Sequence, residues 1–217
     1  MDKVERTIAN LEKNNIKGYF AKSKEDVTNI LESLIKAGEK VTVGGSQTLF
    51  QCGVIDWLKS GMFEYYDRYD ENKSREEILD VFRQASFCDS YITSANALTE
   101  EGEMLNVDGH CNRISAIVHG PKQVIVIVGI NKIVKDLDEA VLRVKEIAAP
   151  LNAKRLKKNT YCAEHGRCIS LEDEKTKYKL GAGCNSEDRI CCNYVVSSYQ
   201  QVKNRIKVVI VGESLGY

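Results

Sequence analysis

The sequence predicts an α/β fold in which a mostly parallel sheet is flanked by helices. Strand and helix patterns alternate over most of the 217 residues. Residues 124–128 form a continuous β-branched run, which is typical of a strand buried on both faces in a parallel sheet. Strands separated by helices of about 10 to 15 residues indicate βαβ units. With 43% hydrophobic and 29% charged residues, the composition excludes a disordered chain or a fibre.

Capping signals mark the helices of the first half. Ser23 with Asp26, and Ser74 with Glu77, have the capping-box form, in which a hydroxyl accepts an otherwise unpaired backbone N–H. Gly38 fits the end of the helix that Ser23 opens. In chain order, we expect helices over 3–14 and 23–38, a strand over 40–43, helical turns over 47–50 and 54–58, a strand over 63–66, a helix from 74, and a strand over 91–93.

The second half continues the alternation until one segment interrupts it. After the strand over 124–128, Asp136 is expected to cap a helix that Pro150 ends. Two further strands are predicted over 194–196 and 206–211. Residues 158–192 are rich in cysteine, polar and without periodicity. We therefore expect residues 1–217 to form one domain, with 158–192 as a cysteine-rich loop or subdomain inserted in it near the C-terminus.

Charge and hydropathy narrow the class of partner. The formal net charge is zero, whereas a nucleic-acid binder carries a basic surplus that neutralises phosphates, so no nucleic-acid partner is expected. The longest apolar run is far shorter than the roughly 18 residues of a membrane span. The charged start of the chain lacks the apolar core of a signal peptide. We therefore expect a cytoplasmic protein with no membrane partner.

Polar residues follow the predicted strands at the edge where parallel sheets bind ligands. Gly44, Gly45, Ser46 and Thr48 come directly after one strand, and glycines there allow an anion to approach backbone N–H groups. The alternative is a tight βα turn with a serine cap. After the later strand over 124–128, Asn131 and Lys132 are candidates for holding a phosphate; the alternative is an ordinary βα connection.

Two further stretches carry candidate catalytic groups. Thr93, Ser94 and Asn96 end a strand and could line a cleft, with Glu100 as general base or nucleophile. The alternative is a local turn with a solvated acidic pair.

In the other stretch, Arg113 offers a fork suited to a carboxylate or phosphate, with Asn112 beside it. Asp108 would act as an acid or base, or would hold Arg113. The alternative is an Asp-Gly turn with a buried ion pair.

The cysteines are the strongest chemical signal. Cys162, Cys168, Cys184 and Cys191 fall within one polar segment, with His165 and Cys192 nearby. Thiolates are soft ligands that select zinc or iron–sulfur clusters, and a metal would stabilise a segment with few apolar residues. The alternative is a set of reduced free thiols, since the spacing is not that of a standard metal site.

Several of these stretches also carry a family resemblance. The sequence resembles the LUD-domain family, the lactate-utilisation family that includes lactate utilization protein C. The matching stretches are Gly44-Gly45-Ser46-Gln47-Thr48-Leu49, residues 93–102, Asn106-Val107-Asp108-Gly109 with Asn112-Arg113, Gly120-Pro121-Lys122, residues 129–134, residues 148–156, Asp188-Arg189-Ile190-Cys191 and residues 211–216.

This resemblance implies a fold similar to the NagB/RpiA/CoA-transferase group and a link to the oxidation of L-lactate to pyruvate. It also implies iron–sulfur oxidoreductase subunits as partners. Oligomerisation stays open.

Two hypotheses of function follow. In the first, the chain is an enzyme or enzyme subunit that binds a small anionic metabolite at the strand-end cleft. Its chemistry would be lactate oxidation or, with Glu100 as nucleophile, the processing of CoA or phosphate esters. Oxidation needs an electron acceptor, which the cysteines or a partner must supply. In the second hypothesis, the chain is a non-catalytic binding or assembly subunit whose cysteine segment is clipped by a metal.

Overall fold

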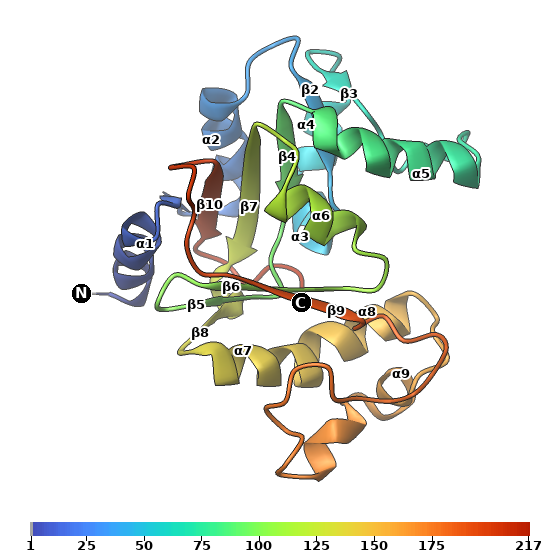
Figure 1. Ribbon diagram of the computed structural model, residues 1–217. Coiled ribbons are helices and arrows are strands. Elements are labelled where there is room, and N and C mark those ends of the chain that lie inside the picture. Colours follow the sequence, from blue (N-terminus) through green and yellow to red (C-terminus); the bar gives the residue numbers. More distant parts are fainter. Residues whose placement is uncertain (1) are drawn as a thin grey trace.

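A six-stranded sheet, parallel throughout, forms the centre of the molecule (Figure 1). The computed structural model describes residues 2–217. In spatial order, the strands are β1 (Lys17–Ala21), β10 (Ile206–Val211), β7 (Gln123–Gly129), β4 (Ser90–Thr93), β2 (Lys40–Val43) and β3 (Glu64–Tyr65). The expectation of a mostly parallel sheet flanked by helices is confirmed.

Two hydrophobic cores cover the two faces of this sheet, and β7 shows how the sequence divides between them. Ile125 and Ile127 point into one core, whereas Val124, Val126 and Val128 point into the other. All five side chains are fully buried, as the β-branched run predicted. The first core is closed by α2 (Val27–Leu34), α3 (Gln47–Gln51) and α4 (Val54–Leu58), and the second by α1 (Lys3–Lys13) and α6 (Asn112–Val118).

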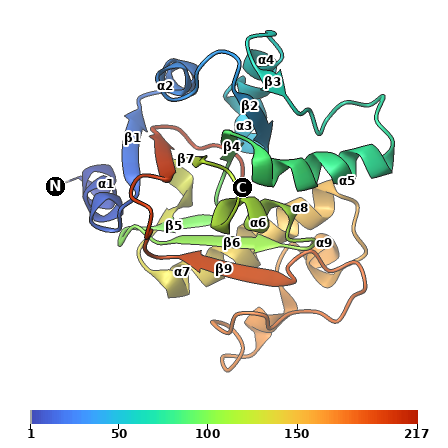
Figure 2. The same cartoon turned by 45° about the horizontal axis from the view of Figure 1, so that its top comes forward.

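A second, mixed sheet crosses below the carboxyl ends of the first (Figures 1 and 2). In it, β6 runs antiparallel to both of its neighbours, whereas β5 and β8 are parallel. A third core packs this sheet against α7 (Leu137–Arg143). The spatial order is β8 (Ile133–Val134), β5 (Ala97–Thr99), β6 (Met104–Asp108) and β9 (Asn193–Ser197). The strand predicted over 194–196 therefore exists, but it belongs to this sheet.

The predicted caps are mostly confirmed. Ser74 and Glu77 form a capping box at α5 (Arg75–Gln84), and Asp136 caps α7. The prediction that Pro150 ends the helix is wrong. The chain continues through a π-helical turn (Val144–Ala148) into α8 (Ala149–Arg155), and Pro150 lies in the first turn of α8. Lys145 O, in the π-helical turn, accepts the N–H of Cys168.

Residues between α8 and β9 contain little regular structure. They include α9 (Tyr161–His165) and a 3₁₀ turn (Ile169–Glu172), and the remainder winds below the second sheet (Figure 1). Further 3₁₀ turns span Lys24–Asp26, Ala85–Phe87 and Ile130–Lys132. Within residues 2–217, no helix combines the length and the apolar character that crossing a membrane requires.

Candidate functional site

A cavity of about 730 Å³ opens where the strands of the main sheet end. Its walls come from the segments that follow β2, β4, β6 and β7, together with α8 and residues 187–192. This is the edge at which parallel α/β sheets bind ligands. The predicted residues that line it are Gly45, Ser46, Ser94, Asn96, Asp108, Asn112, Arg113 and Lys132.

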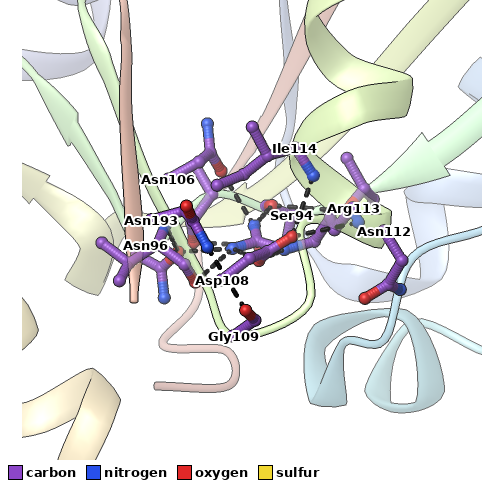
Figure 3. A network of polar contacts seen from close by, with 12 residues as sticks. Ser94, Asn96, Asn106, Asp108, Gly109, Asn112, Arg113, Ile114 and Asn193 are labelled. Atoms are coloured by element: carbon purple, nitrogen blue, oxygen red, sulfur yellow. Dashed lines mark hydrogen bonds and ion pairs between the residues drawn. The ribbon is translucent and has the colours of Figure 1, made fainter. Parts of the chain in front are cut away.

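Arg113 lies at the centre of a buried polar network (Figure 3). Its Nε donates to Asp108 Oδ1 at 3.0 Å, and its Nη2 lies 2.8 Å from the same oxygen. The guanidinium uses its remaining donors within the protein, so no N–H of Arg113 is left for a ligand. The other acceptors are Ser94 O (2.7 Å), Asn106 Oδ1 (2.8 Å), Asn96 Oδ1 (2.6 Å) and Val107 O (3.1 Å).

Asp108 is fully engaged by its own surroundings. Besides the guanidinium, its Oδ2 accepts the backbone N–H groups of Arg113 (3.0 Å) and Ile114 (2.9 Å) at the start of α6. The carboxylate thus joins the end of β6 to α6. The buried Asp–Arg pair, one of the two alternatives left open by the sequence, is what the structure shows. Asp108 and Arg113 therefore position the wall of the cavity.

Lys132 has neutral partners only. It lies in the 3₁₀ turn after β7, and 3% of its surface is exposed. Its Nζ donates to Ser94 Oγ (3.0 Å), Thr48 Oγ1 (3.1 Å) and Ala95 O (3.4 Å). Burial, and then the nearby charges of Arg143 and Arg113, lower the pKa of Lys132 to about 7. A large fraction of this amine is therefore neutral near pH 7.

The cavity carries a surplus of positive charge. Seven lysine and arginine residues line it, against three acidic residues. Two of those acids are already paired, Asp108 with Arg113 and Asp188 with Lys158 (3.3 Å). In the part of the chain that the structure describes, no carboxylate lies within ion-pair distance of Arg68, Arg75 and Arg155.

None of these three arginines was among the site residues predicted from the sequence. Arg68 closely follows the short strand β3, so the rule that ligands bind at strand ends could have found it. Its Nε is buried without a hydrogen-bond partner, and its guanidinium lies over the ring of Phe82 at 4.5 Å. Arg155 belongs to a basic cluster with Lys154, Lys157 and Lys158. Charge runs of this kind usually face solvent, so the sequence provided no reason to place it in a site. Arg75 begins α5 and carries no sequence signal.

Glu100 does not reach the cavity. The sequence placed it just beyond the strand over 91–93, but β5 lies between and carries the chain along the second sheet toward α1. There Glu100 Oε2 accepts a hydrogen bond from Arg6 Nε (2.8 Å), and Lys3 lies at 3.9 Å. The structure thus separates this candidate catalytic group from the other predicted site residues.

The turn Gly44-Gly45-Ser46 allows close packing between neighbouring strands. A Cβ on Gly44 would lie 2.5 Å from Thr93 Oγ1, so only glycine allows β2 to pack this closely on β4. Gly45 and Ser46 face the cavity. The helix that follows them, α3, has only five residues. Thr48 and Thr93 lie buried behind the wall. Asn131 holds the C-terminal segment, since its Oδ1 accepts the N–H of Leu215 (3.0 Å).

The four predicted metal ligands gather, but not as a metal centre. Cys162, Cys168, Cys184 and Cys191 line one small cavity of about 20 Å³, together with Lys145. Among residues 2–217, no three His, Cys, Asp or Glu side chains are arranged to hold a metal ion. His165, which could have completed the set, stacks on Tyr161 at 4.0 Å. The geometry therefore does not support the expected zinc or iron–sulfur centre.

The fold and the cavity define an α/β protein with a cation-rich cavity at the carboxyl edge of a parallel sheet. The family model of the LUD domain matches residues 4–211, and the chain belongs to this family, which is associated with lactate utilisation. A search among curated protein sequences finds no match.

Solved structures show more distant likeness. A DUF162 family protein from Deinococcus radiodurans is 17% identical, with 97% of this chain and 94% of that chain covered and a TM-score of 0.49. The alpha subunit of a malonate decarboxylase from Acinetobacter baumannii is 12% identical, with 99% and 38% covered and a TM-score of 0.41. The protein eIF2B beta from Chaetomium thermophilum is 14% identical, with 56% of this chain and 42% of that chain covered and a TM-score of 0.37. At these TM-scores, none of the likenesses carries an argument.

Proposed function

We propose that this LUD-domain protein binds a small anionic metabolite in the strand-end cavity, and that the metabolite belongs to the conversion of L-lactate to pyruvate. The observation that carries the proposal is the set of unpaired arginines, Arg68, Arg75 and Arg155, on the walls of one cavity. A partly enclosed site with uncompensated cations attracts anions, and guanidinium groups suit carboxylates and phosphates.

Cavity size favours a second candidate ligand. A volume of about 730 Å³ lies within the range of about 300 to 1,000 Å³ that is typical of small-molecule sites. A three-carbon acid would fill only part of it. A larger anion, such as a phosphate ester or a CoA ester, would use more of the arginines. This candidate agrees with a NagB/RpiA/CoA-transferase-like fold, which we also propose. Because Glu100 lies elsewhere, a glutamyl-thioester step is not part of the proposal.

Calorimetric titration tests the binding site. L-lactate, pyruvate, inorganic phosphate and CoA would each be titrated into the wild type, Arg68→Gln and Arg155→Gln. We expect at least one of the four to bind, and each substitution to weaken that binding by about tenfold or more, as for the loss of one charge-assisted hydrogen bond. Arg83→Gln is the matched control, because Arg83 is exposed and pairs with Asp80 on α5. If none binds, or if all variants bind equally, the proposal fails.

Any role in lactate oxidation requires an electron acceptor, because removing two electrons from a hydroxy acid needs a redox partner. We propose that an iron–sulfur oxidoreductase subunit supplies it. A non-catalytic role in binding or assembly is the alternative. Turnover of lactate with that partner, lost in Arg68→Gln but not in Arg83→Gln, would favour the enzymatic role.

A cluster or zinc on Cys162, Cys168, Cys184 and Cys191 stays a prediction that rests on their shared cavity. Anaerobic purification with analysis of iron, zinc and acid-labile sulfide tests it. Iron with sulfide, or zinc, in stoichiometric amount would support a metal centre, and the absence of all three would overturn it. Alanine substitution of Cys162 should remove the metal, whereas substitution of the distant, buried Cys88 should not.

A further inference from the structure

Lys132 is a buried amine, and among residues 2–217 no carboxylate lies within ion-pair distance of it. Each element packed against its Nζ offers a neutral group or another cation. These groups are Thr48 on α3, Ser94 and Ala95 after β4, and Arg143 on α7. Arg143 donates to the backbone oxygens of Asn96 and Asn131, so it too has no carboxylate partner. A charged Lys132 would therefore lie beside a second buried cation, which favours its neutral form.

The same amine is on the wall of the ligand cavity. A Cβ on Gly216 would lie 3.3 Å from Nζ, so a side chain at that position would crowd the amine. Desolvation and a neighbouring cation are the two conditions that convert lysine into a nucleophile. The lowered pKa of Lys132, about 7, agrees with this environment.

We propose that Lys132 is an amine nucleophile that captures the carbonyl group of a 2-oxo acid bound in the cavity. This inference rests on the proposed function, because the carboxylate of the 2-oxo acid would be the anion that the unpaired arginines hold. The geometry on which it stands is a buried amine at the wall of a cation-rich cavity, in contact with two hydroxyl groups.

The step balances without a further reagent. Nζ attacks the carbonyl carbon, and the carbon–oxygen double bond becomes a carbinolamine C–OH. The hydroxyl then leaves as water, and the carbon–nitrogen double bond of a Schiff base forms. Both hydrogens of that water come from the amine, and nothing is oxidised or reduced. Ser94 Oγ and Thr48 Oγ1, at 3.0 and 3.1 Å from Nζ, are placed to pass the proton from nitrogen toward oxygen.

Borohydride trapping tests the inference. The full chain is incubated with pyruvate, reduced with sodium borohydride and analysed by intact-protein and peptide mass spectrometry. We expect one reduced pyruvyl adduct per chain, on the peptide that contains Lys132, and its complete loss in Lys132→Met and Lys132→Arg. Lys135→Met is the matched control, because Lys135 lies three residues along and is exposed; this variant should retain the adduct. If a Lys132 variant does not fold, peptide mapping of the wild type still locates the adduct.

Calorimetry on the same samples separates the two proposals. Pyruvate that binds without forming an adduct on Lys132 would overturn this inference and leave the binding site standing. An adduct that is equally abundant in Lys132→Met would also overturn it, because another lysine would then be reacting. If pyruvate neither binds nor forms an adduct, the inference fails together with its 2-oxo acid ligand.

Discussion

Two buried lysines show how differently two regions of this chain use a cation. Lys132 belongs to the strand-end cavity, where two hydroxyls and one distant carbonyl are its partners. Lys145 belongs to the π-helical turn above the cysteine segment, and its Nζ donates to the backbone oxygens of Thr176 (2.8 Å), Lys177 (3.0 Å) and Lys179 (3.0 Å). The first amine donates mainly to hydroxyl groups beside a cavity, and the second donates to three carbonyl groups.

The difference follows from secondary structure. Around the cavity, strands and helices satisfy much of the backbone, and the main partners of Lys132 are two hydroxyl groups. Residues 157–192 contain only α9 and one 3₁₀ turn, so side chains must satisfy the backbone instead. Arg189 does the same work as Lys145, donating to the carbonyl groups of Gly181, Cys184 and Cys191. Lys145 and Arg189 therefore have a structural role, whereas Lys132 donates chiefly to two hydroxyl groups at the cavity wall.

The largest effect should come from Arg113, the cavity cation whose guanidinium N–H groups are all used within the protein. Arg113→Met would leave the carboxylate of Asp108 buried without its ion-pair partner, which costs about 3 to 5 kcal/mol in comparable cases. We expect the free energy of unfolding, measured in urea, to fall by that amount. Arg83→Met, on the exposed face of α5, should cost less than about 1 kcal/mol. A small effect at Arg113 would show that the cavity does not depend on this network.

Lys145→Met should have the next largest effect, confined to the cysteine segment. It removes one donor from three carbonyl groups. Thr176 O and Lys179 O keep backbone donors, the N–H groups of Lys179 (3.1 Å) and Ala182 (3.3 Å), so Lys177 O alone is left unsatisfied among the described residues. We expect a loss of about 1 to 3 kcal/mol, the cost of one unsatisfied buried group. Amide hydrogen exchange should accelerate in residues 173–180 and stay unchanged in β7. Uniform acceleration over the whole chain would contradict the separation of the two regions.

The lowered pKa of Lys132 should make the free energy of unfolding depend on pH. Its pKa falls from an ordinary 10.5 to about 7 on folding, so between these values the unfolded chain binds more protons than the folded one. Stability from this group therefore rises with pH, by at most about 1.4 kcal/mol per pH unit, and the gain is absent below about pH 7. We expect the unfolding free energy of the wild type, relative to that of Lys132→Met, to increase from pH 7 to 10. A constant difference would mean that Lys132 stays charged.

The same contrast explains what the sequence could predict. The β-branched run of β7 and the capping residues Ser74 and Asp136 report local preferences, and the structure confirms them. Strand β6 escaped prediction because Asn106 and Asp108, which are rare in strands, are buried in it. Arg113, which follows in α6, stabilises both by donating to Asn106 Oδ1 and Asp108 Oδ1. That compensation is a property of the tertiary structure.

The position of Glu100 was predicted wrongly for a related reason, and its substitution should have the smallest effect of those considered. The three-residue strand β5 lies between the end of β4 and Glu100, and so short a strand has no reliable sequence pattern. Glu100→Gln removes an ion pair with Arg6, whose side chain is 48% exposed, so we expect a loss of at most about 1 kcal/mol. Because Glu100 lies at α1, pyruvate binding and the Lys132 adduct should be unchanged in calorimetry and mass spectrometry. Loss of either would bring Glu100 back into the chemistry and would mean that the second sheet moves relative to the first during ligand binding.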